Sequence, residues 1–157
     1  TITTQNIFDA FLGDYDELKT FFHGHSYSGN PLSCAAAIAN LEIFEKNNTL
    51  HQLQNKIQLF ENELQEFNGL KSVSEIRNKG LMAGIDLIKN KTTGEKFSLK
   101  ERIGKKVCDS ALKEGILLRP LGDTIVLMPP ISINNSEIKK LTKATYKAIK
   151  DVTENNV

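Results

Sequence analysis

The stretch from Thr49 to Gly69 constrains the fold most, because its apolar residues recur every three or four positions. The apolar stripe comprises Leu50, Leu53, Ile57, Phe60, Leu64 and Phe67. This spacing predicts an amphipathic helix, with a capping box formed by Thr49 and Gln52 at its start. The stripe is short for a coiled coil, so we expect the helix to pack on a sheet of its own domain.

The residues that follow predict that sheet and two more helices. Four strands are expected, at 73–77, 81–88, 116–119 and 124–128. Turn residues separate the members of each strand pair. Capping boxes formed by Ser98 with Glu101 and by Asn134 with Glu137 predict the starts of the other two helices. This order of elements indicates an α/β or α+β domain.

The first 48 residues have a different pattern. Residues 5–12 predict a short helix behind a Thr4 cap, and Asn30-Pro31 is typical of the start of a second helix that runs to about Lys46. Small and apolar side chains cover several faces of the second helix, so we expect it to be largely buried. Residues 1–30 have a weaker core pattern and are expected to belong to a neighbouring domain.

Composition and charge exclude several classes of partner. The 20 basic and 19 acidic side chains give a net charge of +1, which favours small molecules or protein as partners over nucleic acid or an anionic membrane. No apolar run approaches the roughly 20 residues of a membrane span. Cys34 and Cys108 are the only cysteines, and no secretory signal precedes them. A cytoplasmic location is therefore expected.

The segment from His23 to Asn30 is a candidate ligand loop. It places histidines, serine hydroxyls and glycines directly before a predicted helix, where backbone N–H groups and hydroxyls can hold an anion. A plain polar turn that ends in a helix cap explains the same residues equally well. A metal site at His23 and His25 is disfavoured, because His51 is the only other histidine and zinc usually needs three or four ligands.

Arg119 is the second candidate, because it follows the apolar run Ile116-Leu117-Leu118 and is expected to be partly buried at the end of a strand. A guanidinium in such a place needs an anionic partner and matches a carboxylate in a two-bonded fork. From the residues alone, that carboxylate belongs either to a ligand or to an internal salt bridge.

Several motifs together resemble one enzyme family. H-G-H-S-Y-S-G-N-P-L at 23–32 is similar to the H-G-x-[ST]-[FY]-x-G-N-P-L signature of class III, fold-type I pyridoxal-phosphate-dependent aminotransferases. R-N-K-G-L-M-A-G-I at 77–85 resembles a strand of the family's small domain. L-R-P-L-G at 118–122 and V-L-M-P-P at 126–130 resemble its substrate-arginine strand pair. The resemblance covers essentially the whole chain.

The resemblance implies a domain plan. Residues 1–30 would be the end of the large cofactor-binding domain, 31–48 a connecting helix, and 49–157 the C-terminal small domain with its α and β layers. It also implies a homodimer in which the cofactor site is shared across the interface.

The resemblance assigns roles to four residues. Ser26 would bind the phosphate of pyridoxal 5'-phosphate, with His25 beside it, in the active site of the dimer partner. Gly24 would lie against substrate, and Arg119 would hold the substrate carboxylate. The family lysine that carries the cofactor matches a point before Thr1, and Lys19 does not match its motif. The chain is therefore expected to be the C-terminal portion of the enzyme and inactive alone.

The exact loop and strand motifs are most similar to one branch of the family. That branch transfers an amino group from S-adenosylmethionine to 8-amino-7-oxononanoate and forms 7,8-diaminononanoate for biotin synthesis. Diamine and omega-amino-acid aminotransferases share much of both motifs and remain an alternative. A non-enzymatic interaction module, docking a partner on the 50–67 face, is the other alternative.

Overall fold

The computed structural model describes residues 2–155. The chain divides into two compact units, Thr1–Lys46 and Asn47–Val157, and each is described by itself. The first unit carries the candidate loop and the second carries Arg119. Among the described residues, no helix combines the length and the apolar character needed to cross a membrane.

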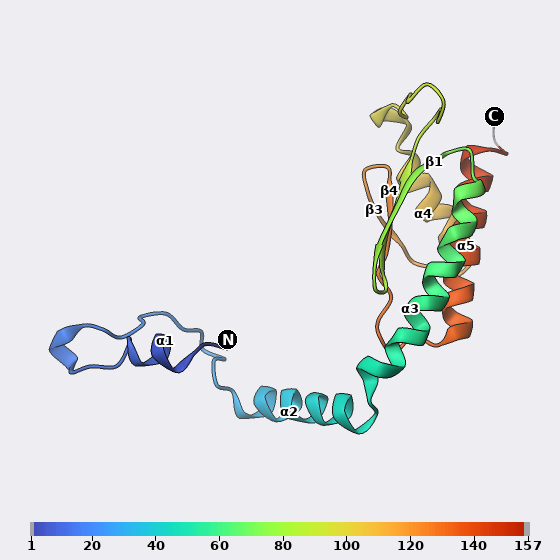
Figure 1. Ribbon diagram of the computed structural model, residues 1–157. Coiled ribbons are helices and arrows are strands. Elements are labelled where there is room, and N and C mark those ends of the chain that lie inside the picture. The colour runs from blue at the N-terminus through green and yellow to red at the C-terminus, as the bar shows by residue number, and fades with distance from the viewer. Residues whose placement is uncertain (1, 156–157) are drawn as a thin grey trace. The chain divides into compact units, whose positions relative to one another are not determined.

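The second unit is built on a four-stranded antiparallel sheet with strand order β1-β2-β4-β3 (Figure 1). Its strands are β1 Val73–Lys79, β2 Met82–Leu87, β3 Arg119–Leu121 and β4 Thr124–Leu127. The two hairpins, β1–β2 and β3–β4, meet where β2 pairs with β4. The mixed α/β character expected from the sequence is confirmed.

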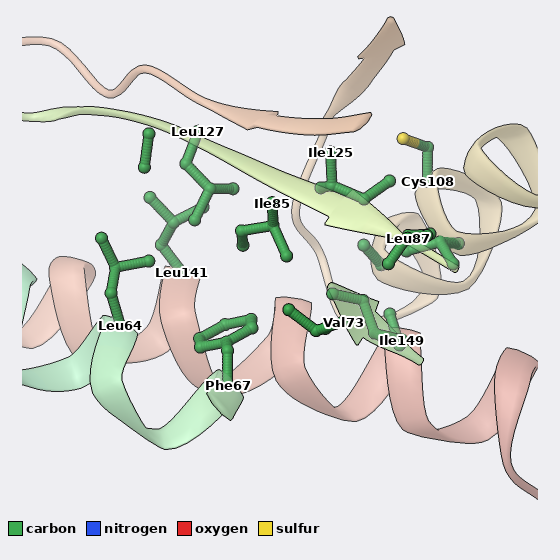
Figure 2. Packing of buried hydrophobic residues seen from close by; sticks show 14 of the residues in the cluster. Leu64, Phe67, Val73, Ile85, Leu87, Cys108, Ile125, Leu127, Leu141 and Ile149 are labelled. Atoms are coloured by element: carbon green, nitrogen blue, oxygen red, sulfur yellow. The ribbon is translucent and has the colours of Figure 1, made fainter. Parts of the chain in front are cut away.

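Three helices complete this unit, and all contribute side chains to one core. They are α3 Thr49–Gln65, α4 Ile103–Lys113 and α5 Asn135–Thr153, with short 3₁₀ turns at Glu66–Gly69 (η2) and Leu99–Glu101 (η3). Alternate residues of β2 and β4, including Ile85 and Ile125, are fully buried against them. Figure 2 shows Leu64, Phe67, Leu141 and Ile149 packed with the sheet residues Ile85 and Leu127.

The apolar stripe of α3 packs as the sequence predicts. Phe60, Leu64 and Phe67 are at most 1% exposed, whereas Leu50 at the start of the stripe remains 65% exposed. The stripe therefore belongs to the core of its own domain, as predicted, and does not serve as a partner-helix surface.

Two helix starts differ from the prediction. Asn48, in a left-handed conformation, is the N-cap of α3, and its side chain makes no cap bond. The Thr49–Gln52 capping box is therefore wrong. The Ser98–Glu101 box does form, but it caps the short η3, and α4 begins only after Arg102 has turned the chain through a left-handed conformation. The sequence of a capping box is a local pattern. Whether its hydrogen bonds form depends on the backbone conformation of the residues that enter the helix.

The third strand is shifted from the predicted 116–119. Gly115, at φ +79°, ends α4, and the Ile116 N–H bonds back to the Ala111 carbonyl. The following residues cross from the helix to the sheet, so pairing with β4 begins at Arg119. Arg119 starts the strand and does not close it.

The first unit contains α1 Gln5–Asp9, a 3₁₀ turn η1 at Tyr15–Glu17, and α2 Pro31–Lys46. The bounds of α2 and its Asn30 cap are confirmed, but α1 is shorter than predicted and Thr4 makes no side-chain cap bond. No residue of α2 is buried, so the expected burial of this helix is wrong for this chain. The reason is that none of the described elements of this unit, within residues 2–46, buries a side chain of the helix.

Candidate functional site

The loop at residues 23–29 presents a row of rings. Alternate residues of an extended segment project to the same side, which brings Phe21, His23, His25 and Tyr27 together in sequence. Successive ring centroids are 5.7, 5.4 and 5.2 Å apart, and the His25 and Tyr27 rings are stacked with an interplanar angle of 3°. Both histidine side chains, His23 and His25, therefore pack against neighbouring rings. Within residues 2–155, no group of three or more His, Cys, Asp or Glu side chains is arranged to hold a metal ion.

Hydrogen bonds close this loop into a turn. The Ser28 N–H donates to the His25 carbonyl at 2.9 Å, and the His25 N–H donates to the Ser28 hydroxyl oxygen at 3.1 Å. Gly29, at φ +68°, adopts the left-handed backbone conformation that a side chain would disfavour. The turn thus fixes the backbone on both sides of Ser26.

The start of α2 uses its own N–H groups. The Asn30 side-chain oxygen accepts hydrogen bonds from the N–H groups of Leu32 at 3.0 Å and Ser33 at 3.1 Å. The Cys34 N–H donates to the Asn30 carbonyl. The anion-binding capacity of this segment therefore lies in the loop and not at the helix end.

Ser26 is the residue of the loop with the most unused donors. In the part of the chain that the structure describes, its hydroxyl and N–H, and the N–H of Tyr27, make no hydrogen bond. All three groups belong to exposed residues. Donors of this kind suit a phosphate group, and this chemistry fits pyridoxal 5'-phosphate.

Arg119 lies on the outer face of the sheet in the second unit. Cross-strand pairing places Arg119, Val126, Gly84 and Arg77 in one row, while the alternate residues face the core. Arg119 is exposed, so the expected partial burial is wrong. Nor does it form an internal ion pair with any residue between 2 and 155. Its guanidinium is available to an outside carboxylate.

Arg77, at the other end of the row, is paired with two carboxylates. It donates through Nη2 to Asp86 Oδ1 at 2.9 Å and through Nη1 to Asp86 Oδ2 and to Glu75 Oε2, the latter at 2.6 Å. The Thr124 hydroxyl donates to Asp86 Oδ1 at 2.7 Å. This network was absent from the sequence-based predictions, although the opposite charges on the two sides of the Asn78–Gly80 turn were an available signal. Arg119 is thus the one unpaired guanidinium of this row.

The Asp86 carboxylate should make stability depend on pH. The hydrogen bond from Arg77 lowers its pKa, aided by the bond from Thr124 and opposed by desolvation. A lowered folded pKa contributes stability that is fully present above the unfolded value of about 3.9 and is lost as pH falls through the folded value. We expect Asp86→Asn to cost about 1 kcal/mol at pH 7, since the pair is partly exposed, and little at pH 2.

Urea unfolding of the purified chain at both pH values measures this difference. Asp109→Asn is the matched control, because Asp109 pairs with Lys105 in an exposed ion pair on α4. Equal losses for the two variants at pH 7 would contradict the role of the Asp86 network.

A groove of about 1010 Å³ lies beside β3 in the second unit. Arg119 lines it together with the apolar side chains of Leu117, Leu121 and Met128, each more than 60% exposed. A cationic fork next to apolar side chains suits a ligand with a carboxylate and an aliphatic chain.

The family model described as "Aminotransferase class-III" matches residues 1–149. The chain belongs to the class-III aminotransferases. Membership confirms the family resemblance of the loop and strand motifs, and the family uses pyridoxal phosphate.

Several of the similar proteins belong to the branch of the family that the loop and strand motifs suggest. Adenosylmethionine-8-amino-7-oxononanoate aminotransferase of Aquifex aeolicus is 48% identical over 97% of this chain and 34% of its own length. The solved structure of the Methanocaldococcus jannaschii enzyme of the same name is 45% identical, with a TM-score of 0.90 over 96% of this chain and 34% of that one. Gamma aminobutyrate transaminase 3 of Solanum lycopersicum is 33% identical over 99% of this chain and 30% of its own.

The chain spans about a third of the length of these relatives. It is homologous to the adenosylmethionine-8-amino-7-oxononanoate aminotransferases. Of the predicted site residues, Gly24, His25 and Ser26 lie together in the loop of the first unit, and Arg119 lies in the second unit.

Proposed function

We propose that this chain is the C-terminal part of an aminotransferase that moves an amino group from S-adenosylmethionine to 8-amino-7-oxononanoate, giving 7,8-diaminononanoate for biotin synthesis. The observation that carries the proposal is the 48% identity to the Aquifex aeolicus enzyme over 97% of the chain. The exposed guanidinium of Arg119 beside an apolar groove is consistent with an acceptor that has a carboxylate on an aliphatic chain.

The domain plan implied by the family belongs to the same proposal. Residues 49–157 would form the small domain, 31–48 the connecting helix, and 1–30 a strip of the large domain. The enzyme would be a cytoplasmic homodimer with its cofactor site shared between subunits. The exposed apolar side chains of α2, including Leu32 and Leu41, are consistent with further protein covering this helix.

The loop residues would hold the cofactor by its phosphate. The Ser26 hydroxyl and the Ser26 and Tyr27 N–H groups would donate to phosphate oxygens, with His25 alongside and Gly24 against substrate. Pyridoxal phosphate, when bound, supplies the electron sink for amino-group transfer. Arg119 would orient the acceptor by binding its carboxylate. This carboxylate lies away from the reacting atoms, so its binding sets the position of the acceptor's aliphatic chain.

The choice of amino donor tests the function. The full-length protein, with 8-amino-7-oxononanoate as acceptor, is expected to form diaminononanoate with S-adenosylmethionine and not with ornithine, putrescine or alanine. A preference for one of the other donors would replace this proposal with a different class-III activity. The 33% identity to the tomato transaminase makes an omega-amino acid the first alternative donor to try.

Ser26→Ala in the full-length protein is expected to weaken pyridoxal phosphate binding about tenfold, because one charge-assisted hydrogen bond to the phosphate is lost. Ser26→Thr keeps the hydroxyl and serves as the matched control, with binding close to that of the parent protein. Titration of the apoprotein, followed by cofactor absorbance, gives both affinities. Equal affinities for the alanine variant and the parent would remove Ser26 from the phosphate site.

A further inference from the structure

The β3–β4 hairpin that carries Arg119 has little support from the sheet itself. β3 has only three residues, lies at the edge of the sheet and pairs only with β4. Its middle residue, Pro120, has no N–H to donate. The position of Arg119 therefore depends on how the Gly122-Asp123 turn is held.

Asp123 ties this turn to two other elements. Its carboxylate accepts a hydrogen bond from the Gly104 N–H, in the first turn of α4, at 3.2 Å. Its carbonyl accepts from the N–H of Leu87, the last residue of β2, at 3.0 Å. An N–H at a helix start has no partner within its own helix, so a carboxylate supplied by the turn satisfies it and suits the helix dipole.

Gly104 permits the close approach that this bond requires. It is buried, and a Cβ placed on it would lie 2.2 Å from the Gly122 carbonyl oxygen and 3.1 Å from Pro120 Cβ. Any side chain at this position would push the turn and β3 away from α4. The absence of a side chain is what lets the hairpin sit against the helix.

We infer that Asp123 and Gly104 form a positioning pair for Arg119: they lock the β3–β4 hairpin onto α4 and so fix where the guanidinium meets the substrate carboxylate. The inference rests on the proposed function for the identity of the carboxylate. A displacement of the hairpin by about 1 Å is enough to spoil a two-bonded fork.

Three substitutions in the full-length protein separate positioning from general stability. Asp123→Ala removes the acceptor of the Gly104 N–H, whereas Asp123→Asn keeps an oxygen that can accept it. Gly104→Ala is expected to displace the turn while Asp123 itself is left unsubstituted. Gly69→Ala is the matched glycine control, because Gly69 is exposed and a Cβ there would meet no atom within 4 Å.

The kinetic test compares 8-amino-7-oxononanoate with its methyl ester, which lacks the charged carboxylate. Asp123→Ala and Gly104→Ala are expected to raise KM for the acid about tenfold, with kcat and the KM of the ester within about twofold. Asp123→Asn and Gly69→Ala should match the parent. If Asp123→Ala changes acid and ester alike, or changes neither, the pair does not position Arg119.

A crystal structure of the Asp123→Ala protein tests the same inference without activity. Arg119 is expected to move by about 1 Å or more relative to the parent structure, and an unmoved Arg119 overturns the inference. Arg119→Lys, assayed with acid and ester, tests the proposed function separately. If the substitution changes the kinetic constants of the acid and of the ester by the same factor, the carboxylate role of Arg119 fails, whatever the position of the hairpin in the Asp123→Ala structure.

Discussion

Arg119→Ala in the full-length protein is expected to lower kcat/KM for 8-amino-7-oxononanoate about a hundredfold, because the substrate carboxylate loses both bonds of a charge-assisted fork. Arg119→Lys keeps the charge without the fork and should fall between the parent and the alanine variant. The methyl ester of the acceptor should be nearly unaffected by either substitution. Steady-state kinetics with both compounds measure the difference.

Arg77→Ala is the matched control for this prediction. Arg77 lies in the same cross-strand row as Arg119, but its guanidinium is bound by Asp86 and Glu75. Its removal should not discriminate between acid and ester. If Arg77→Ala lowers kcat/KM for the acid selectively and Arg119→Ala does not, the substrate carboxylate binds to Arg77 and the prediction for Arg119 is wrong.

Phe60→Ala is expected to destabilise the purified chain by about 3–5 kcal/mol, because the ring of Phe60 is 0% exposed and its loss leaves a cavity in the core. A loss of this size is a large part of the 5–15 kcal/mol typical of a folded domain. Urea unfolding followed by circular dichroism gives the difference in free energy.

Leu50→Ala is the control on the same helix stripe. Leu50 belongs to the same periodic pattern as Phe60 but is 65% exposed, so its truncation should cost less than about 1 kcal/mol. Similar losses for the two variants would mean that α3 does not pack through the predicted stripe.

Local signals predicted the elements best where the determining contacts are close in sequence. The Asn134–Glu137 box starts α5 and the Asn30 side chain caps α2, because each bond joins residues two or three positions apart. The same rule failed at Thr49, where the left-handed Asn48 sets the helix start. A capping-box sequence therefore forms its hydrogen bonds only where the backbone enters the helix in a suitable conformation.

Contacts between residues that are distant in sequence were not predicted. Arg77 and Asp86 meet because β1 and β2 pair in one register, and Asp123 meets Gly104 because the β3–β4 turn packs on α4. The opposite charges on the two sides of the β1–β2 turn were a sequence signal of the Arg77–Asp86 pair, whereas the spacing of Gly104 and Asp123 carries no such signal. Arg119 remains a predicted site residue, and its exposure depends on β3 beginning at that residue.

The sequence by itself determined the periodic core of the second unit, the helix caps made by near neighbours, and the motifs by which the chain belongs to the class-III aminotransferases. Only the tertiary structure decided that Arg119 has no ion-pair partner among residues 2–155 while Arg77 pairs with Asp86, and that Asp123 accepts a hydrogen bond from Gly104. The physical reason is that hydrophobic periodicity and capping act over a few residues. The availability of a charge, by contrast, depends on which distant groups the sheet register brings beside it.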